Sequence, residues 1–350
     1  VETLSALNTA MAPTKAPPAA EVTPPSPTPT ETIIAKPLPA GPAGVQLIYK
    51  DASRNLWAWS EGGFTLQLTT SGDVESIALS PDGTLAAFTR SSDYVSYSLW
   101  VVPTAGGSEL RLLDSGELSS MGMIDVAVSA ALDSLAWVPG SHTLAIGTRP
   151  VFEGPGLLRN EDLTLIDADS GAKTPVFARG EGGVYSFSPD GARIAISRTD
   201  RVDLANTNGS GRLSGLVSFA PVLTYSEYAF YPDPVWAPDS SRFVVAIPPS
   251  ASLDANGPTT LHQINLDGST LPLRSFETAP LMWPSLSPNL AQAAYLTPGD
   301  PFNLMLVQSS GDLGGLSFPA VRAFLGWAPD STRFAYVDNA SGAVNIGSIA

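Results

Sequence analysis

One pattern of hydrophobic and polar positions recurs along most of the chain. Each copy has a large apolar residue two positions before a proline, then a short polar turn, then apolar residues five and seven positions after the proline with a small apolar residue between them. The alternation predicts a strand. Apolar side chains on both faces predict that other sheets cover both sides of it, and the small residue allows one of them to approach closely. The copies are centred on Pro81, Pro139, Pro189, Pro238, Pro288 and Pro329.

The residues around each proline predict a tight reversal between two strands. Proline ends the first strand because it has no N–H for a sheet ladder. An Asp side chain accepts local hydrogen bonds, and Gly tolerates a positive φ. We therefore assign structural turn roles to Asp82, Gly83, Asp190, Gly191, Asp239 and Asp330. The sequences "VPGS" at Val138 and "SPNL" at Ser287 lack Asp-Gly, so these two turns are expected to differ from the others.

A second hairpin follows each copy, so the repeating unit has four strands, here called a to d from the inside outward. Repeats of about 40 to 60 residues predict a propeller or another repeat array. Five complete units and two partial ones contain seven b–c pairs. The sequence therefore predicts an all-β propeller of four-stranded blades, with seven blades favoured and six as the alternative. In either case the ends of the ring must meet, because an open ring leaves unpaired sheet edges.

The repeated motif resembles the TolB-type, WD40-like (PD40) propeller repeat, whose usual core reads W-SPDG-x-x-[IL]-A-[FY]. The resemblance covers most of residues 45–350. It implies the propeller fold and leaves the function open, because many unrelated activities use this scaffold.

The first 44 residues have a different composition from the rest. Ten of the 32 prolines lie between Pro13 and Pro42, mixed with Thr, Ala and Ser. Such a segment predicts an extended or disordered tether in residues 1–44, followed by the propeller in residues 45–350. It resembles the spacer that follows the signal or lipid-attachment site of bacterial exported proteins, which implies a secreted or envelope-tethered protein outside the cytoplasm. The cysteine that such a lipid anchor uses is not present in this sequence.

Composition and charge exclude several classes of function. The chain has 18 Lys and Arg against 33 Asp and Glu, a formal net charge of -15, so a nucleic acid partner is not expected. No apolar run in the sequence is long enough for a transmembrane helix. Without cysteine there is no thiolate nucleophile or cysteine metal site, and the two histidines exclude a multi-histidine metal site.

The long connections all belong to the b–c and d–a class, which lies at one end of each blade. Loops on a rigid scaffold usually carry binding. One connection is rich in aromatic residues with polar groups, which are favoured at protein and sugar contacts. The candidate binding residues are Tyr225, Glu227, Tyr228, Phe230, Tyr231 and Asp233. Packing of these rings as a lid over the blades is the alternative.

No catalytic residue and no cofactor is predicted. The repeated Asp residues stand in equivalent turns of different blades, too far apart to cooperate, and no G-x-S-x-G elbow occurs. We expect a non-enzymatic binding or scaffold propeller whose long-loop face binds a protein partner or takes a place in a larger assembly. The alternatives are a hydrolase or lactonase-like enzyme at the mouth of the central channel, with a divalent cation there, and a binder of cell-wall polysaccharide.

Overall fold

The structure is a computed structural model of the whole chain, which divides into two units, Val1–Ile34 and Ala35–Ala350. The described residues all belong to the second unit. They are residues 45–60, 65–154, 158–225, 228–249, 257–279, 282–310 and 315–349. The predicted division into a tether and a propeller at residue 45 stays a prediction, because residues 1–44 lie outside the described part.

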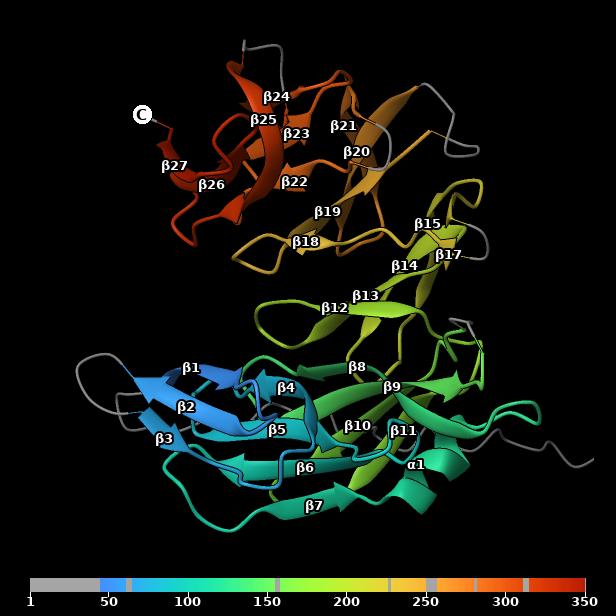
Figure 1. Cartoon of the computed structure of the whole chain (residues 1–350). Helices are drawn as coiled ribbons and strands as arrows, with labels where there is room; N and C mark the ends of the chain where they lie inside the picture. Colours follow the sequence, from blue (N-terminus) through green and yellow to red (C-terminus); the bar gives the residue numbers. More distant parts are fainter. Residues whose placement is uncertain are drawn as a thin grey trace, which may run out of the picture. The chain divides into compact units, whose positions relative to one another are not determined.

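The first half of the described chain forms three antiparallel sheets (Figure 1). The first sheet is β1 (Val45–Lys50), β2 (Leu56–Ser60) and β3 (Thr65–Gln67). The second is β4 (Val74–Leu79), β5 (Leu85–Arg90), β6 (Ser98–Pro103) and β7 (Leu110–Leu113). The third is β8 (Ser129–Trp137), β9 (Thr143–Val151), β10 (Leu163–Asp167) and β11 (Lys173–Phe177).

The second half continues the same pattern of consecutive antiparallel strands. The fourth sheet is β12 (Val184–Phe187), β13 (Arg193–Ser197), β14 (Arg201–Asn206) and β15 (Leu213–Ser218). A small hairpin follows, β16 (Leu223–Tyr225) and β17 (Tyr228–Ala229). The fifth sheet is β18 (Val235–Trp236), β19 (Arg242–Ile247), β20 (Pro258–Asn265) and β21 (Thr270–Glu277).

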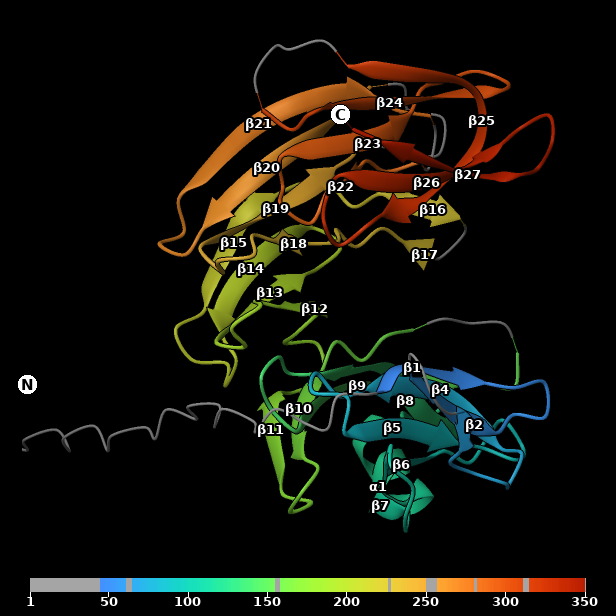
Figure 2. The same cartoon turned by 90° about the vertical axis from the view of Figure 1, so that its left-hand side faces the viewer.

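The last sheet has six strands, because one long strand belongs to two repeat units. The strands are β22 (Ser285–Leu286), β23 (Gln292–Leu296), β24 (Phe302–Gln308), β25 (Leu316–Trp327), β26 (Arg333–Asp338) and β27 (Val344–Ser348). The first part of β25 pairs with β24 and its second part pairs with β26, and Figure 2 shows it as a long curved strand. Strand d of one unit thus continues into strand a of the next.

The predicted β-propeller architecture is confirmed. The described strands form seven b–c pairs, β1–β2, β5–β6, β9–β10, β13–β14, β19–β20, β23–β24 and β26–β27. They define repeat units 1 to 7, of which unit 1 has strands b to d and unit 7 has strands a to c. Because units 6 and 7 share one sheet, the described strands form six sheets of three or more strands. The choice between seven and six blades stays a prediction.

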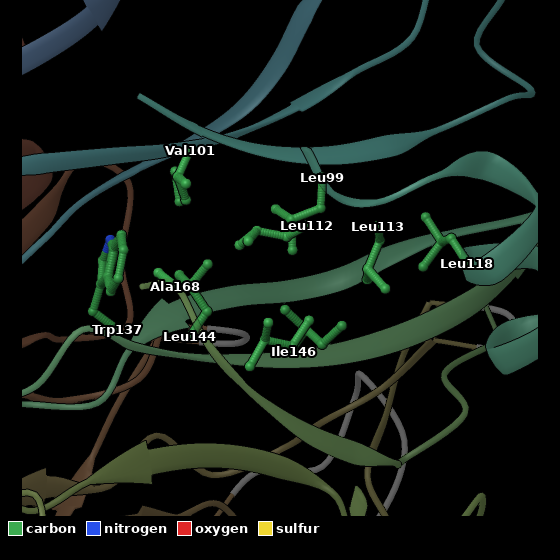
Figure 3. Packing of buried hydrophobic residues seen from close by; sticks show 11 residues of the cluster. Leu99, Val101, Leu112, Leu113, Leu118, Trp137, Leu144, Ile146 and Ala168 are labelled. Carbon is green, nitrogen blue, oxygen red and sulfur yellow. The ribbon is translucent and has the colours of Figure 1, made fainter. Parts of the chain in front are cut away.

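Buried side chains of the described residues form six core clusters, each between two successive units. Figure 3 shows the cluster between units 2 and 3, where Leu99 and Val101 of β6 face Leu144 and Ile146 of β9. In units 2 to 6 the small residue between the apolar pair, such as Ala87 or Ala145, is also buried. A strand that is apolar on both faces therefore lies between two sheets, as the repeated pattern predicts.

The turns after the repeated prolines show why most units use the same short motif. In five of them the second residue after the proline has a positive φ, and its N–H donates to the carbonyl before the proline. Four of these residues are Gly83, Gly191, Ser240 and Ser331. Leu290 of "SPNL" is the fifth, with φ 60°, so the expectation that this turn differs is wrong: Asn289 accepts the same local hydrogen bonds as Asp.

The "VPGS" turn does differ. Its positive φ falls on Gly140, one position earlier than in the other units. Proline at the second position and a glycine of positive φ at the third form a type II turn. This turn is closed by a hydrogen bond from Ser141 N to Val138 O of 3.2 Å.

Tryptophan at the end of strand a connects neighbouring units. The indole Nε1 of Trp137 donates to Ala78 O at 3.0 Å, that of Trp236 to Ser186 O at 3.1 Å, and that of Trp327 to Ser285 O at 3.0 Å. Each acceptor is the third residue before the repeated proline of the preceding unit. The apolar residue predicted to end strand a therefore also bonds the preceding unit wherever it is tryptophan.

One helix, α1 (Ser115–Gly122), is described, in a connection that the sequence analysis treated only as a long loop. Asp114 caps it, and Glu117 reaches back to the Asp114 N–H, which is a complete capping box. Within the described part of the chain, no helix has the length and apolar character needed to cross a membrane.

Candidate functional site

The aromatic connection between β15 and β18 contributes to both the surface and the core. Leu223 and Tyr228, on the hairpin β16–β17, are exposed. Phe230 is buried, with its ring centroid 4.7 Å from that of Trp283 and 6.4 Å from that of Phe219. Phe230 therefore anchors the connection, while the hairpin extends beyond it.

Tyr231 joins this connection to the b–c connection of unit 3. Its hydroxyl donates to Glu161 Oε1 at 3.0 Å, and the Arg159 guanidinium lies over its ring, 5.2 Å from the centroid. Burial, together with the charge of Glu161 and this hydrogen bond, raises the pKa of Tyr231 to about 12. The phenol is therefore protonated at neutral pH and acts as a hydrogen-bond donor.

Glu161 and Arg159 are the centre of an ionic network that the sequence did not reveal. Arg198 Nη2 lies 2.9 Å from Glu161 Oε2, and Arg159 Nη1 donates to Asp133 Oδ2 at 2.7 Å. Arg198 also donates to the carbonyls of Gly180 and Gly182, at 2.8 and 2.7 Å. The network therefore links the b–c connections of units 3 and 4 with the d–a connection between these two units. None of its members belongs to the repeated motif, so no periodic signal marked them.

Two aspartates in this region, Asp133 and Asp162, have partly buried carboxyl groups. Burial raises the pKa of Asp133, although the charges of Arg159 and Arg149 oppose the shift. Burial also raises the pKa of Asp162, against hydrogen bonds from the backbone N–H and the hydroxyl of Thr148, at 2.7 and 2.6 Å.

Asn160 completes this region of unit 3. Its amide donates to Gly122 O at 2.8 Å and to Thr148 Oγ1 at 2.7 Å, which fixes the end of α1. Residues 159 to 162 of this b–c connection therefore each bond to another part of the chain. We infer that it is rigid enough to position Tyr231.

The remaining candidate binding residues are Asp233, Glu227 and Tyr225, and among the described residues Asp233 makes no contact of the kind that Tyr231 makes with Glu161. Asp233 is exposed, although neighbouring protein desolvates its carboxyl enough to raise its pKa. Glu227 and the side chain of Tyr225 lie outside the described residues. Of the six candidates, Tyr228 and Asp233 are on the surface and Tyr231 is bound to Glu161.

The turn aspartates accept hydrogen bonds within their own turns. Asp82 Oδ1 accepts from the Ser80 hydroxyl at 2.7 Å and from the Thr84 N–H at 3.1 Å. Asp190, Asp239 and Asp330 accept from the backbone N–H two residues later, at 3.0, 3.1 and 2.9 Å.

His142 lies between two units. Its Nε2 is 3.3 Å from Asp82 Oδ2, and its Nδ1 is 3.1 Å from Asp169 Oδ1. His262 lies in β20, where burial lowers its pKa. Within the described ranges, no three His, Asp or Glu side chains are grouped so that they could hold a metal ion.

Among the described connections, those of the b–c and d–a class carry exposed large apolar residues, whereas the described residues of the a–b and c–d turns contribute none; the other exposed large apolar residues lie on strands of the six main sheets. The b–c and d–a connections lie at the same end of every unit, because consecutive strands are antiparallel. On these connections the exposed large apolar residues are Tyr94, Val95, Met123, Val126, Val128, Leu158, Leu223, Tyr228 and Met282.

Comparison with known proteins gives the fold and no family. No family model matches the chain, and no curated protein matches it. Among solved structures, an oligogalacturonate lyase from Vibrio parahaemolyticus is similar at 12% identity, TM-score 0.51, over 84% of this chain and 82% of that one. Dipeptidyl peptidase 4 from Porphyromonas gingivalis is similar at 12% identity, TM-score 0.51, over 78% of this chain and 45% of that one.

TolB from Acinetobacter baumannii is also among the similar structures. It shares 13% identity at a TM-score of 0.40, over 77% of this chain. The chain spans 64% of the length of that TolB, less than two thirds. At 12% identity, the likeness to the lyase and the peptidase shows the propeller fold alone.

Proposed function

We propose that this chain is a non-enzymatic binding or scaffold propeller that acts outside the cytoplasm and binds a protein partner through the long-loop face, meaning the b–c and d–a ends of its units. The observation that carries the proposal is that, among the described connections, only those of this face present exposed large apolar side chains. Single exposed apolar residues are ordinary, whereas grouped ones, such as those between Met123 and Val128, favour an interaction site. The extracytoplasmic location is supported by the Pro/Thr-rich sequence before residue 45.

Two connections are the main contact elements in this proposal. The segment from Met123 to Val128 presents three exposed apolar side chains, with Val126 the most exposed of the three. The hairpin β16–β17 presents Leu223 and Tyr228 and is held in place by buried Phe230. Of the described aromatic rings in this hairpin and the residues just after it, that of Tyr228 is the exposed one. Sugars stack on a platform of exposed rings, so a protein partner is favoured over a polysaccharide.

The test compares partners recovered from the native source by full-length protein and its variants. Val126→Asp and Tyr228→Ala should each lower recovery of a specific partner about tenfold or more, because central contacts of this kind contribute about 1 to 2 kcal/mol or more each. Leu271→Asp is the matched control, since Leu271 is also an exposed apolar residue but lies on β21, away from the long-loop face. Equal recovery by all variants would refute the proposal.

A further inference from the structure

Two arginines at the long-loop face of unit 3 have no carboxylate partner within the described residues. Arg149 lies near the end of strand b, β9, and Arg179 lies in the d–a connection after β11. Neither forms an ion pair with a described Asp or Glu. Other arginines at this end of units 2 to 4 do have such a partner: Arg90 pairs with Glu109, Arg159 with Asp133, Arg198 with Glu161 and Arg201 with Asp200.

The carboxylate beside Arg149 is already bound by another arginine. Asp133 lies at an irregular position of β8, next to the end of β9 that carries Arg149. Arg159 Nη1 donates to Asp133 Oδ2 at 2.7 Å. Burial raises the pKa of Asp133, and the charges of Arg159 and Arg149 oppose this shift, so Arg149 is close to the carboxyl group without pairing with it. The half-buried Arg149 guanidinium therefore has no acceptor in the described part of the chain.

Arg179 contacts the exposed apolar segment from Met123 to Val128. Its Nη2 donates to Met123 O at 2.8 Å. The carboxylate on which its charge acts is that of Asp162, which accepts from the Thr148 N–H and hydroxyl at 2.7 and 2.6 Å and is engaged as well. A guanidinium has five N–H donors, and one backbone carbonyl uses only part of them. Arg179, which is exposed, therefore has donors available at the surface.

Both arginines lie next to the apolar elements that the proposed function uses. Arg179 is bonded to the segment from Met123 to Val128. Arg159, which occupies the carboxylate beside Arg149, lies over the ring of Tyr231, just after the hairpin β16–β17. This part of the face thus combines Met, Tyr and Arg side chains, which are enriched in protein–protein interfaces.

We propose that the protein partner presents carboxylate side chains next to apolar ones, and that Arg149 and Arg179 bind these carboxylates. The inference rests on the proposed function and adds the chemistry of the partner to it. A guanidinium holds a carboxylate through two parallel N–H···O bonds, which fix orientation as well as adding affinity. Arg149 is the stronger contact of the two, because water screens a half-buried charge less than an exposed one.

A partner with a basic contact surface is the alternative, and it would use the exposed carboxylates of the same region. Asp125 and Glu153 are exposed and have no ion-pair partner among the described residues. Water solvates an exposed carboxylate well, and such groups are ordinary in a chain of net charge -15. A half-buried guanidinium has lost part of its hydration, which a hydrogen-bonded partner replaces. The acidic partner is therefore favoured.

Peptide selection tests this chemistry with a defined probe. A library of random peptides displayed on phage is selected on the immobilised full-length protein, after depletion on Val126→Asp, so that peptides specific for the long-loop face remain. The selected peptides should carry Asp or Glu beside large apolar residues. Their affinity should fall about tenfold or more for Arg149→Gln, and less for Arg179→Gln.

Two controls separate a direct contact from a general effect of charge. Arg193→Gln should bind the peptides as the wild type does, because Arg193 is another half-buried arginine without an ion-pair partner among the described residues, but it lies beside an a–b turn. Arg149→Lys keeps the charge and loses the paired donors, so its affinity should lie between those of the wild type and Arg149→Gln. A peptide with the amide in place of its acid should bind more weakly to the wild type and unchanged to Arg149→Gln.

The outcomes that overturn this inference differ from those that overturn the proposed function. Peptides rich in Lys or Arg, with affinity lost in Asp125→Asn, would mean a basic partner, and uncharged peptides would mean that the arginines are not used. In both cases the long-loop face still binds, and the proposed function stands. If depletion on Val126→Asp removes every binding peptide, the proposed function fails together with the inference.

Discussion

At the residue scale, the repeated turn allows different side chains at one backbone conformation. Gly191 and Ser240 both have a positive φ at the same turn position. Ser240 is useful there, because its hydroxyl accepts from the Asp190 N–H of the preceding unit at 3.1 Å. Gly191 has no such freedom, since a Cβ would lie 2.3 Å from Pro139 O. The choice between Gly and Ser therefore depends on the neighbouring unit.

We predict that Gly191→Ser lowers the free energy of unfolding by about 3 kcal/mol, as a strained backbone and a steric overlap combine. Gly140→Ser is the matched control, because Gly140 has φ 72° and no atom near its missing Cβ. It should cost only about 1 kcal/mol. Chemical denaturation of both variants measures the difference, and equal losses would show that Pro139 moves aside.

The carboxyl group of Asp82 should contribute to stability in a pH-dependent way. Burial alone would raise its pKa, but hydrogen bonds from Ser80, Thr84 and His142 outweigh burial and lower the pKa from 3.8 to about 2. A lowered pKa means that the ionised form is stabilised in the folded state. Its contribution is present above pH 3.8 and is lost as the pH falls toward 2.

We predict that Asp82→Asn is less stable than the wild type at neutral pH and that the two proteins converge near pH 2. Asn289 shows that an amide can accept the same turn hydrogen bonds, so the variant should keep the turn. Denaturation at a series of pH values measures this, and a constant difference between the two proteins across the series would contradict it.

At the element scale, the strands follow from local patterns, whereas the connections between them do not. The alternating pairs and the Pro-Asp-Gly turns predict strands b and the turns before them because both signals are local. Asp114 and Glu117 have the spacing of a capping box, but the apolar residues of α1 have only a weak helical periodicity. The sequence pattern therefore does not predict this helix. The partner of Tyr231, Glu161, is 70 residues away, and no local signal marks such a contact.

The indole hydrogen bonds between units should be measurable. Trp236→Phe removes the bond to Ser186 O and part of a buried ring, and should lower the free energy of unfolding by about 2 kcal/mol. Trp100→Phe is the control, because the Trp100 indole donates to Ser98 of its own strand at 2.8 Å. Its loss should be the smaller one, and the opposite order would refute a role for the inter-unit bond.

At the scale of the whole molecule, the repeat makes the fold predictable and the blade count difficult. Six internal copies of one motif leave little choice of architecture. The number of blades depends on the partial units at the two ends of the chain and on β25, which belongs to two units. A periodic sequence pattern shows neither of these features. The candidate site is likewise predictable only in part. Its aromatic composition identifies the loop between β15 and β18, but the sequence does not indicate the ionic network around Glu161 and Arg159.

The domain boundary also gives a prediction. If residues 1–44 are a tether and the propeller begins at residue 45, a chain that starts at residue 45 should have the same Tm as the full chain. The reason is that a Pro-rich segment buries little apolar surface. Thermal unfolding of the two proteins measures this. A lower Tm for the shorter chain would show that part of the first 44 residues belongs to the propeller.

The indole bonds all run in one direction, from a later unit back to the one before it. Each acceptor is a backbone carbonyl, which any residue supplies, whereas each donor is a side chain of the later unit. A substitution of the tryptophan in one unit therefore changes the contact of that unit with the one before it and leaves the acceptor for the following unit in place.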